Sequence, residues 1–291
     1  MLKLSTKAKT LEDLISIVKC SKVLPIYRFY ASTYLNKKDK ILNQVRSKFD
    51  TNIIVRSSSV SEDNLETSNA GGFDSVLNVD INSFQNIEES ISKAIHSYGE
   101  DLNDKDEVFI QPMLQNVSMS GVIFTADIDT LSPYYIANYD ESGSTTSITS
   151  GEGGSLKTFI CLKENKNIEN KKLGQLIKAA KECEEIFSND FLDIEFAFTE
   201  EELYILQVRA IVLNNKENLS NVGLLNSLNK LNKKIEKLNK PHPNLLGDKT
   251  IFGVMPDWNP AEIVGLRPKR LSLSLYKELI TDETWAYQRD N

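Results

Sequence analysis

Residues 193–209 constrain the fold most, because they read as one β-hairpin: DIEFAF, the polar turn TEEE, and LYILQVR. Two such runs separated by a short turn pair antiparallel. Side chains alternate along a strand, so Asp193 and Glu195 face the same way. If a three-residue turn is centred on Glu201, Glu195 lies directly across from Gln207. The chain must therefore contain an antiparallel sheet that carries a polar row.

That polar row predicts a metal site. Opposed Cβ atoms in such a pair are about 4.5–5.5 Å apart, so the side-chain oxygens of Glu195 and Gln207 can reach one cation. A carboxylate and an amide oxygen, completed by substrate phosphates, suit Mg²⁺. The alternative is a polar strand face exposed to water.

A second strand delivers an arginine into hydroxyl residues. Residues 53–63 read IIVRSSSVSED, with Arg56 at the end of three aliphatic residues. Arg56 could be a solvated strand terminus with serine turns behind it. A guanidinium beside hydroxyls and backbone amides also suits phosphate. Arg209 likewise ends an apolar strand, so we interpret Arg56 and Arg209 as a pair of phosphate-binding arginines.

Composition excludes several classes of protein. The 291 residues include 41 acidic and 34 basic side chains, a net charge of −7, which disfavours a nucleic-acid or anionic-membrane surface. Three distant cysteines fit neither a disulfide framework nor a zinc site, and we expect a reducing cytoplasm. No signal peptide, membrane span or GxxxxGK[ST] loop occurs in the sequence.

Periodicity and turn residues predict further elements. A capping box at Thr10 starts a first helix near residue 10, with Lys7 just ahead of it. The other expected strands are 53–56, 76–79, EVFIQPML, SGVIFTADI and PYYIANYD, and the other expected helices are 83–98, 170–188, 219–238 and one around LSLYKELI.

Six motifs in order carry a resemblance: LSTKAKTLEDL, IIVRSSSVSED, NAGGFDSVLNV, VFIQPM, SGVIFT and DIEFAF…LYILQVR. Together they resemble the ATP-grasp nucleotide-binding domain of the phosphoenolpyruvate synthase and pyruvate phosphate dikinase family. The resemblance implies an α+β fold of two subdomains with ATP in the cleft between them, followed here by a mainly helical, loop-rich segment. The domains it implies are 1–105 and 106–214, a helical linker 215–240, and the start of a following domain at 241–291.

The resemblance also implies site residues. Its phosphate-binding side chains would be Lys7, Arg56 and Arg209, the catalytic set of the ATP half-reaction. Its ATP contacts, with Mg²⁺ on Glu195 and Gln207, would further include Gly71, Gly72, Asp74, Ser75, Gln111 and Asp193. The chemistry agrees, since glycines let a backbone approach phosphate closely and Lys7 adds charge near a helix N-terminus.

Some positions depart from the family. Ser5 and Thr6 stand where the family has glycines before its lysine, Ala8 replaces a following glycine, and ESGSTTSITSG replaces Gly-Leu-Gly-Glu. We therefore expect a stiffer N-terminal phosphate loop and not an orthodox pyruvate-using member.

The resemblance implies phosphoryl transfer from ATP to a histidine on a separate domain, releasing AMP and phosphate, and then to an acceptor. His96 and His242 are the only histidines, and neither has the surroundings of the family's carrier histidine. We therefore expect the chain to be a truncated piece whose downstream phosphohistidine domain lies beyond residue 291.

The tail, FGVMPDWNPAEIVGLRPKRLSLSLYKELI, is similar to a subgroup linked to capsule polysaccharide biosynthesis that includes an L-glutamine kinase. The implied acceptor is then the amide of L-glutamine. Phosphoenolpyruvate synthase and rifampicin-phosphotransferase-like chemistry stay open as alternatives. A non-catalytic nucleotide-sensing domain is the alternative of another class.

Overall fold

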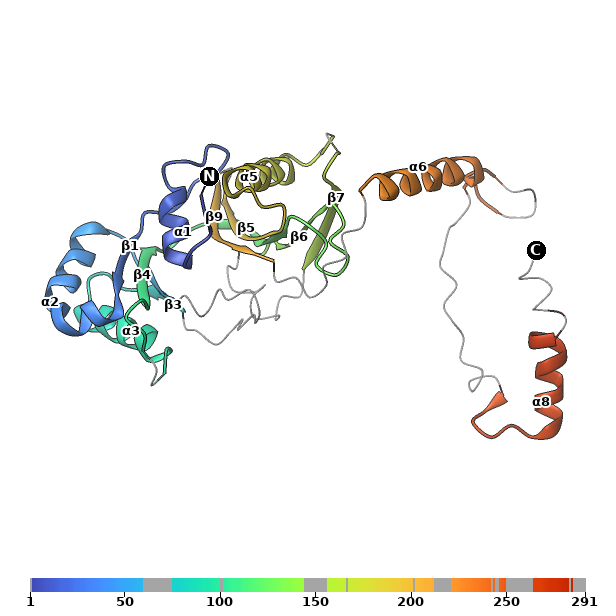
Figure 1. The fold of residues 1–291 in the computed structure, drawn as a ribbon, viewed down its shortest axis with the longest axis horizontal. Helices are drawn as coiled ribbons and strands as arrows, with labels where there is room; N and C mark the ends of the chain where they lie inside the picture. Colours follow the sequence, from blue (N-terminus) through green and yellow to red (C-terminus); the bar gives the residue numbers. More distant parts are fainter. Residues whose placement is uncertain are drawn as a thin grey trace. The chain divides into compact units, whose positions relative to one another are not determined.

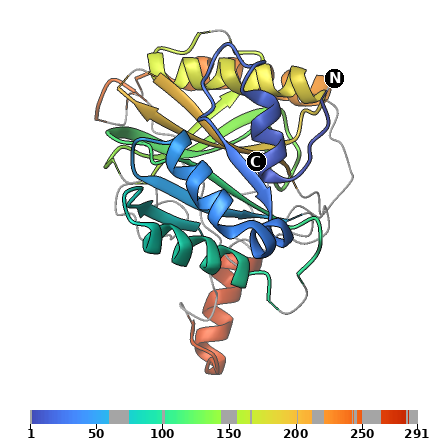
Figure 2. The ribbon, with the colours of Figure 1, turned by 90° about the vertical axis from the view of Figure 1, so that its left-hand side faces the viewer.

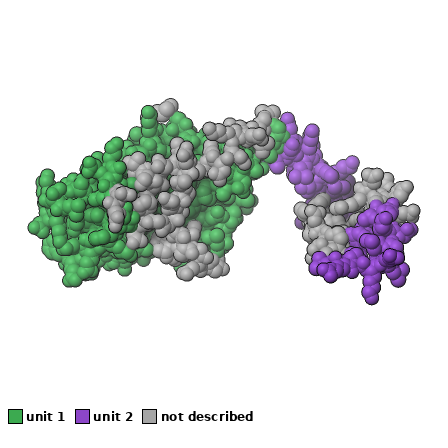
Figure 3. Space-filling model, turned by 60° about the horizontal axis from the view of Figure 1, so that its bottom comes forward, with its two compact units in different colours: residues 1–224 green, residues 225–291 purple. Residues whose placement is uncertain are grey.

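The computed structural model describes residues 2–59, 75–99, 102–143, 156–165, 167–200, 202–211, 221–241, 243, 246–249, 264–282 and 284. The chain divides into unit 1 (Met1–Leu224) and unit 2 (Leu225–Asn291), which Figure 3 colours separately. The fold is α+β, as the sequence predicts, because unit 1 contains two antiparallel sheets with helices packed on them.

The first sheet has the order β1-β4-β2-β3, with every neighbouring pair antiparallel. Its strands are β1 (Tyr27–Tyr30), β2 (Ile53–Ser58), β3 (Ser75–Val79) and β4 (Glu107–Pro112). Helices α2 (Ala31–Lys48) and α3 (Phe84–His96) lie on one side of it (Figures 1 and 2).

The two faces of β2 have different environments. Ile53 and Val55 are fully buried in the core formed with α2 and α3. Because side chains alternate along a strand, Ile54, Arg56 and Ser58 lie on the opposite face. The arginine is thus carried on the sheet face that turns away from the helices.

The second sheet has the order β7-β6-β5-β8-β9 and is also antiparallel throughout. Its strands are β5 (Val117–Phe124), β6 (Tyr134–Asp140), β7 (Lys157–Leu162), β8 (Leu192–Thr199) and β9 (Glu202–Ala210). Helices α1 (Lys7–Leu14) and α5 (Lys171–Phe187) share one apolar core with this sheet. Gly121 permits close pairing of β5 and β6, since a Cβ there would lie 2.3 Å from the Asn138 carbonyl oxygen.

Three helices are described at the C-terminal side: α6 (Asn221–Leu238), which begins in unit 1, and α8 (Arg270–Tyr276) and η1 (Lys277–Asp282) in unit 2. The first matches the expected helix 219–238, and the other two fall in the predicted LSLYKELI region. Helices are thus the regular elements described in this segment.

The first helix begins earlier than its sequence predicts. Its N-cap is Thr6, whose hydroxyl accepts a hydrogen bond from the Lys9 amide at 3.3 Å. Thr10 lies inside the helix and accepts from the Ser5 amide at 2.9 Å. The predicted start near residue 10 is therefore wrong, and Lys7 is the first residue of α1 rather than a loop residue ahead of it.

Two segments cross the expected subdomain ranges. Strand β4, within the expected range 106–214, pairs with β1 and β2 of the first sheet. Helix α1, within the expected range 1–105, packs in the core of the second sheet. The subdomain boundaries stay a prediction. The structure adds that the N-terminal helix α1 packs on the second sheet and not on the first.

Candidate functional site

The β8–β9 hairpin gathers the four predicted polar side chains on one face of the second sheet. Asp193 pairs with Arg209, and Glu195 pairs with Gln207. Directly paired residues in an antiparallel ladder project to the same side. The register predicted from the sequence is confirmed at these two pairs.

The chain reaches that register by a different route. Thr199 pairs with Glu202, so two residues rather than three separate the strands. The pairing then shifts by one residue beyond Phe196, and Leu206 is the extra residue of a β-bulge. Bulges bend a strand and redirect its polar groups, and here the bulge places the Leu206 carbonyl beside the candidate site.

Arg56 reaches from the first sheet to this bulge. Its Nη1 donates to the Leu206 carbonyl at 3.3 Å, and its Nη2 donates to Gln207 Oε1 at 3.2 Å. The same Nη2 lies 3.7 Å from Glu195 Oε2. The guanidinium also lies over the Phe109 ring, 5.4 Å from its centroid. The Arg56 side chain is thus largely buried and hydrogen-bonded, and it is not a solvated strand terminus.

The oxygens of Glu195 and Gln207 converge on one cationic point, the Arg56 Nη2 atom. This donor set fits Mg²⁺, which takes oxygen ligands and few protein ones. Among the residues that the structure describes, no group of three or more His, Cys, Asp or Glu side chains could hold a metal. A metal here would therefore depend on substrate phosphate oxygens for the rest of its shell.

Asp193 and Arg209 form an ion pair beside these two ligands. Arg209 Nε donates to Asp193 Oδ2 at 2.6 Å. The Asp193 Oδ1 atom is buried and accepts no hydrogen bond from any described residue. Burial raises the pKa of the Asp193 carboxyl, Arg209 opposes this shift, and Glu195 adds to it. Asp193 Oδ1 can therefore accept one more hydrogen bond.

Lys7 enters the same region through α1. The hydroxyl of Ser58, two residues beyond Arg56 on β2, accepts from the Ala8 amide at 3.1 Å. This contact brings the first turn of α1 against the end of the strand that carries Arg56. The structure therefore places the Lys7 backbone near the end of β2 at which Arg56 contacts Leu206 and Gln207 of the second sheet.

The other residues predicted to contact ATP stay predictions, and the structure places two of them. Ser75 pairs directly with Arg56 in the β2–β3 ladder. Gln111 is 2% exposed, and its amide donates to the Leu24 carbonyl at 3.4 Å. Gly71, Gly72 and Asp74 lie outside the described residues.

Several residues that hold this site were not foreseen from the sequence. Phe109 lies under Arg56, and Leu206 contributes only a backbone carbonyl through the bulge. Thr6, Arg28 and Glu107 form a polar network at the start of α1. A bulge leaves no local sequence pattern, but the charged residues within β1 (Arg28) and at the start of β4 (Glu107) could have indicated an inward-facing ion pair.

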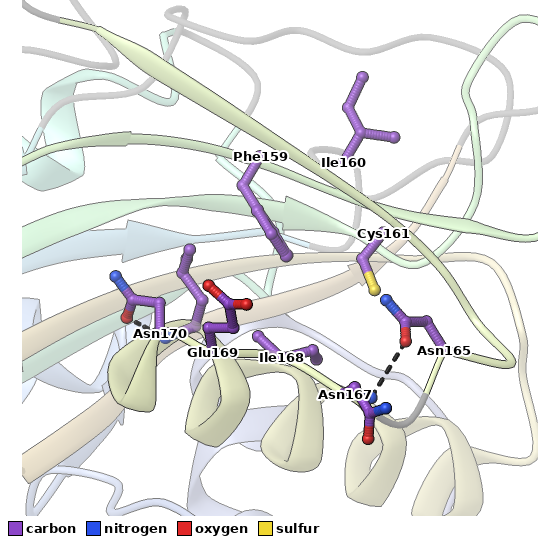
Figure 4. A pocket seen from close by; sticks show the side chains of 9 residues that line it. Phe159, Ile160, Cys161, Asn165, Asn167, Ile168, Glu169 and Asn170 are labelled. Carbon is purple, nitrogen blue, oxygen red and sulfur yellow. Dashed lines mark hydrogen bonds between the residues drawn. The ribbon is translucent and has the colours of Figure 1, made fainter. Parts of the chain in front are cut away.

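A pocket of about 380 Å³ lies elsewhere, between the edge strand β7 and the start of α5 (Figure 4). Its lining is mainly apolar and amide-bearing: Phe159, Ile160, Cys161, Asn165, Asn167, Ile168, Glu169, Asn170 and Leu173. Cys161 and Leu173 belong to the core on the α5 side of the sheet. The pocket is therefore on the opposite face from Glu195 and Gln207.

In the part of the chain that the structure describes, every helix is too short or too polar to cross a membrane.

Comparison with known families gives one match, over the part of the chain that includes most of the first sheet. Residues 30–151 match the family described as pyruvate phosphate dikinase, AMP/ATP-binding domain. The matched range contains Arg56 and Gln111 but neither Lys7 nor the β8–β9 hairpin. The match supports an ATP-binding domain of an ATP-using enzyme. No curated protein matches the chain.

Several solved structures with partial similarity are ligases. The D-Ala:D-Ser ligase VanG of Enterococcus faecalis has 14% identity and a TM-score of 0.41, over 77% of this chain and 61% of that one. The D-alanine–D-alanine ligase of Helicobacter pylori has 16% identity and a TM-score of 0.38, over 70% and 51%. That of Bacillus anthracis, complexed with ATP, has 10% identity and a TM-score of 0.41, over 79% and 67%. The chain spans about six-tenths of the length of the first of these.

Proposed function

We propose that this chain is the Mg·ATP-binding part of an ATP-grasp phosphotransferase of the dikinase type. The convergence of Glu195, Gln207 and Arg56 supports it most, because oxygen ligands from one sheet and a guanidinium from the other meet at one point. The family match over residues 30–151 supports ATP as the ligand.

The side chains have separate roles in this proposal. Glu195 and Gln207 hold Mg²⁺, which when bound neutralises charge on the phosphate oxygens. Arg56 and Arg209 exchange their carboxylate partners for phosphate oxygens, to which a planar guanidinium donates well. Lys7 adds a third positive charge. Phosphoryl transfer depends mainly on such positioning and charge neutralisation.

The loop of Gly71 and Gly72, with Asp74 and Ser75, covers the phosphates in this proposal, and Gln111 borders the adenine. The resemblance of the sequence motifs supports both, together with the direct pairing of Ser75 with Arg56.

The overall reaction that we propose consumes ATP, water and an acceptor and releases AMP, phosphate and the phosphorylated acceptor. The phosphoryl group passes through a histidine on a downstream domain. We propose the side-chain amide of L-glutamine as the acceptor, with pyruvate or an antibiotic hydroxyl as the competing acceptors. The similarity of the tail to the capsule-linked subgroup supports glutamine.

The test is a product analysis with the downstream segment supplied in trans. The chain is incubated with Mg·ATP and L-glutamine, nucleotides are separated by chromatography, and phosphorus products are identified by ³¹P NMR. We expect AMP, phosphate and a nitrogen-bound phosphoryl resonance. ADP as the sole nucleotide product, or no AMP under any condition, would contradict the dikinase route. AMP without the nitrogen-bound product would leave ATP use standing and contradict glutamine as acceptor.

A further inference from the structure

A buried polar network joins the start of α1 to the first sheet. Thr6 donates from its hydroxyl to Glu107 Oε2 at 2.7 Å, and Arg28 Nη1 donates to Glu107 Oε1 at 2.5 Å. Arg28 also donates to Glu12 Oε2 through Nε at 3.1 Å and Nη2 at 2.8 Å. Glu107 is 4% exposed. We call Thr6, Arg28 and Glu107 the α1 clamp.

A second set of contacts pins the next residue of the helix. The Ala8 amide donates to the Ser58 hydroxyl at 3.1 Å. The Tyr98 hydroxyl accepts from the Ser58 amide at 2.7 Å and donates to the Glu107 carbonyl. Glu107 and Ser58 face each other in the β2–β4 ladder. The two residues that flank Lys7 are therefore fixed to two adjacent strands of the first sheet.

The remainder of α1 belongs to the other sheet. Ala8, Leu11 and Leu14 are fully buried in the core that the second sheet shares with α5. One short helix is thus anchored to the first sheet by polar contacts and to the second sheet by apolar contacts.

We infer that Glu107 is a positioning residue for Lys7: its carboxylate, held between Thr6 and Arg28, sets where the Lys7 amine meets the nucleotide phosphates. This inference rests on the proposed function. Glu107 does not contact nucleotide in this account, and it acts only through the backbone at the start of α1. Its effect is therefore confined to ligands that reach Lys7 with their phosphates.

The test uses Glu107→Gln, which keeps the size of the side chain and removes its charge. Dissociation constants for ATP and AMP in the presence of Mg²⁺ are measured by calorimetry for the wild type, Glu107→Gln, Lys7→Met and the double variant. Losing the charged contact of Lys7 with phosphate costs on the order of tenfold in affinity, so we expect Glu107→Gln, by displacing Lys7, to weaken ATP roughly tenfold and AMP less than about twofold.

The double variant separates positioning from general damage. If Glu107 acts through Lys7, adding Glu107→Gln to Lys7→Met has little further effect on ATP, because coupled residues are not additive. Glu184→Gln is the matched control. Glu184, in α5, is a largely buried carboxylate that also lies between a hydroxyl and a cation, here those of Tyr135 and Lys163. We expect this control to leave the ATP and AMP constants unchanged.

Equal weakening of ATP and AMP, or full additivity with Lys7→Met, would overturn the inference while the proposed function stands. A wild type that fails to bind ATP would overturn both. Should Glu107→Gln fail to fold, Thr6→Val and Thr6→Ser replace it. Loss of the hydroxyl in valine should weaken ATP selectively and serine should restore it, and equal behaviour of the two variants would overturn the inference.

Discussion

The Asp193–Arg209 ion pair gives a stability prediction that depends on pH. Arg209→Met keeps the apolar stem of the side chain and removes the donor to the buried Asp193 carboxylate. Breaking a fully buried pair costs about 3–5 kcal/mol. The Arg209 side chain is 36% exposed, so solvent screening reduces that value, and we expect a loss of about 1–3 kcal/mol. For a unit of this size the loss corresponds to roughly 3–10 °C in Tm.

The loss should shrink as the pH falls. Burial already raises the pKa of Asp193, and Arg209 opposes that shift. Without Arg209 the folded-state pKa lies further above the unfolded value, so the folded variant binds a proton more readily than the unfolded chain. Its stability therefore rises as the pH falls through that raised pKa toward the unfolded value.

The assay is urea unfolding of the wild type and Arg209→Met at pH 8, 7, 6 and 5. Lys22→Met is the control, because Lys22 pairs with Glu202 on the strand that carries Arg209 and both side chains of that pair are exposed, so we expect little change in stability. A loss in Arg209→Met that is equal at pH 8 and pH 5, or no larger than that of the control, would refute the reasoning.

Three other predictions concern the second sheet and helix α5, which packs on it. Gly121→Ala should destabilise unit 1 by about 1–3 kcal/mol in denaturant unfolding, because the new Cβ would lie 2.3 Å from the Asn138 carbonyl oxygen. Gly174→Ala in α5 should instead stabilise it by about 0.5–1 kcal/mol, because the nearest atom to the new Cβ is 3.9 Å away. A Gly121→Ala variant with unchanged stability would show that β5 and β6 can move apart without cost. Iodoacetamide at pH 8 should label Cys20 before Cys183, because burial raises the pKa of Cys183 to about 12 and leaves the thiol fully inaccessible. Mass spectrometry that finds Cys183 alkylated first in the folded protein would contradict the packing of α5.

The local parts of the site follow from the sequence, and the parts that join distant segments do not. A three-residue turn assumed at Glu201 puts Glu195 opposite Gln207, and the structure confirms that pairing although a shorter turn and a bulge produce it. The bulge at Leu206 cannot be read from the sequence, because any residue type can occupy it.

Helices and strands whose hydrophobic residues follow no regular spacing are not predicted from the sequence. Strand β1, helix α2 and strand β7 were not predicted, and α2 has a non-helical residue, Lys37, in its middle. The start of α1 was placed too late because Thr10 fits a capping box, whereas tertiary contacts of Thr6 with Glu107 decide the cap. Long-range polar contacts of this kind are absent from any local pattern.

The measurement that tests the central claim most directly is the thermal stability of the chain with Mg·ATP, Mg·GTP and AMP. A ligand at about 100 times its dissociation constant adds roughly 2.7 kcal/mol to a native state that alone binds it. We predict a gain with Mg·ATP that requires Mg²⁺, is lost in Arg56→Ala and Glu195→Gln, and persists in Glu184→Gln. No gain with any nucleotide, or an equal gain in all four proteins, would contradict the assignment of the nucleotide site to the meeting point of the two sheets.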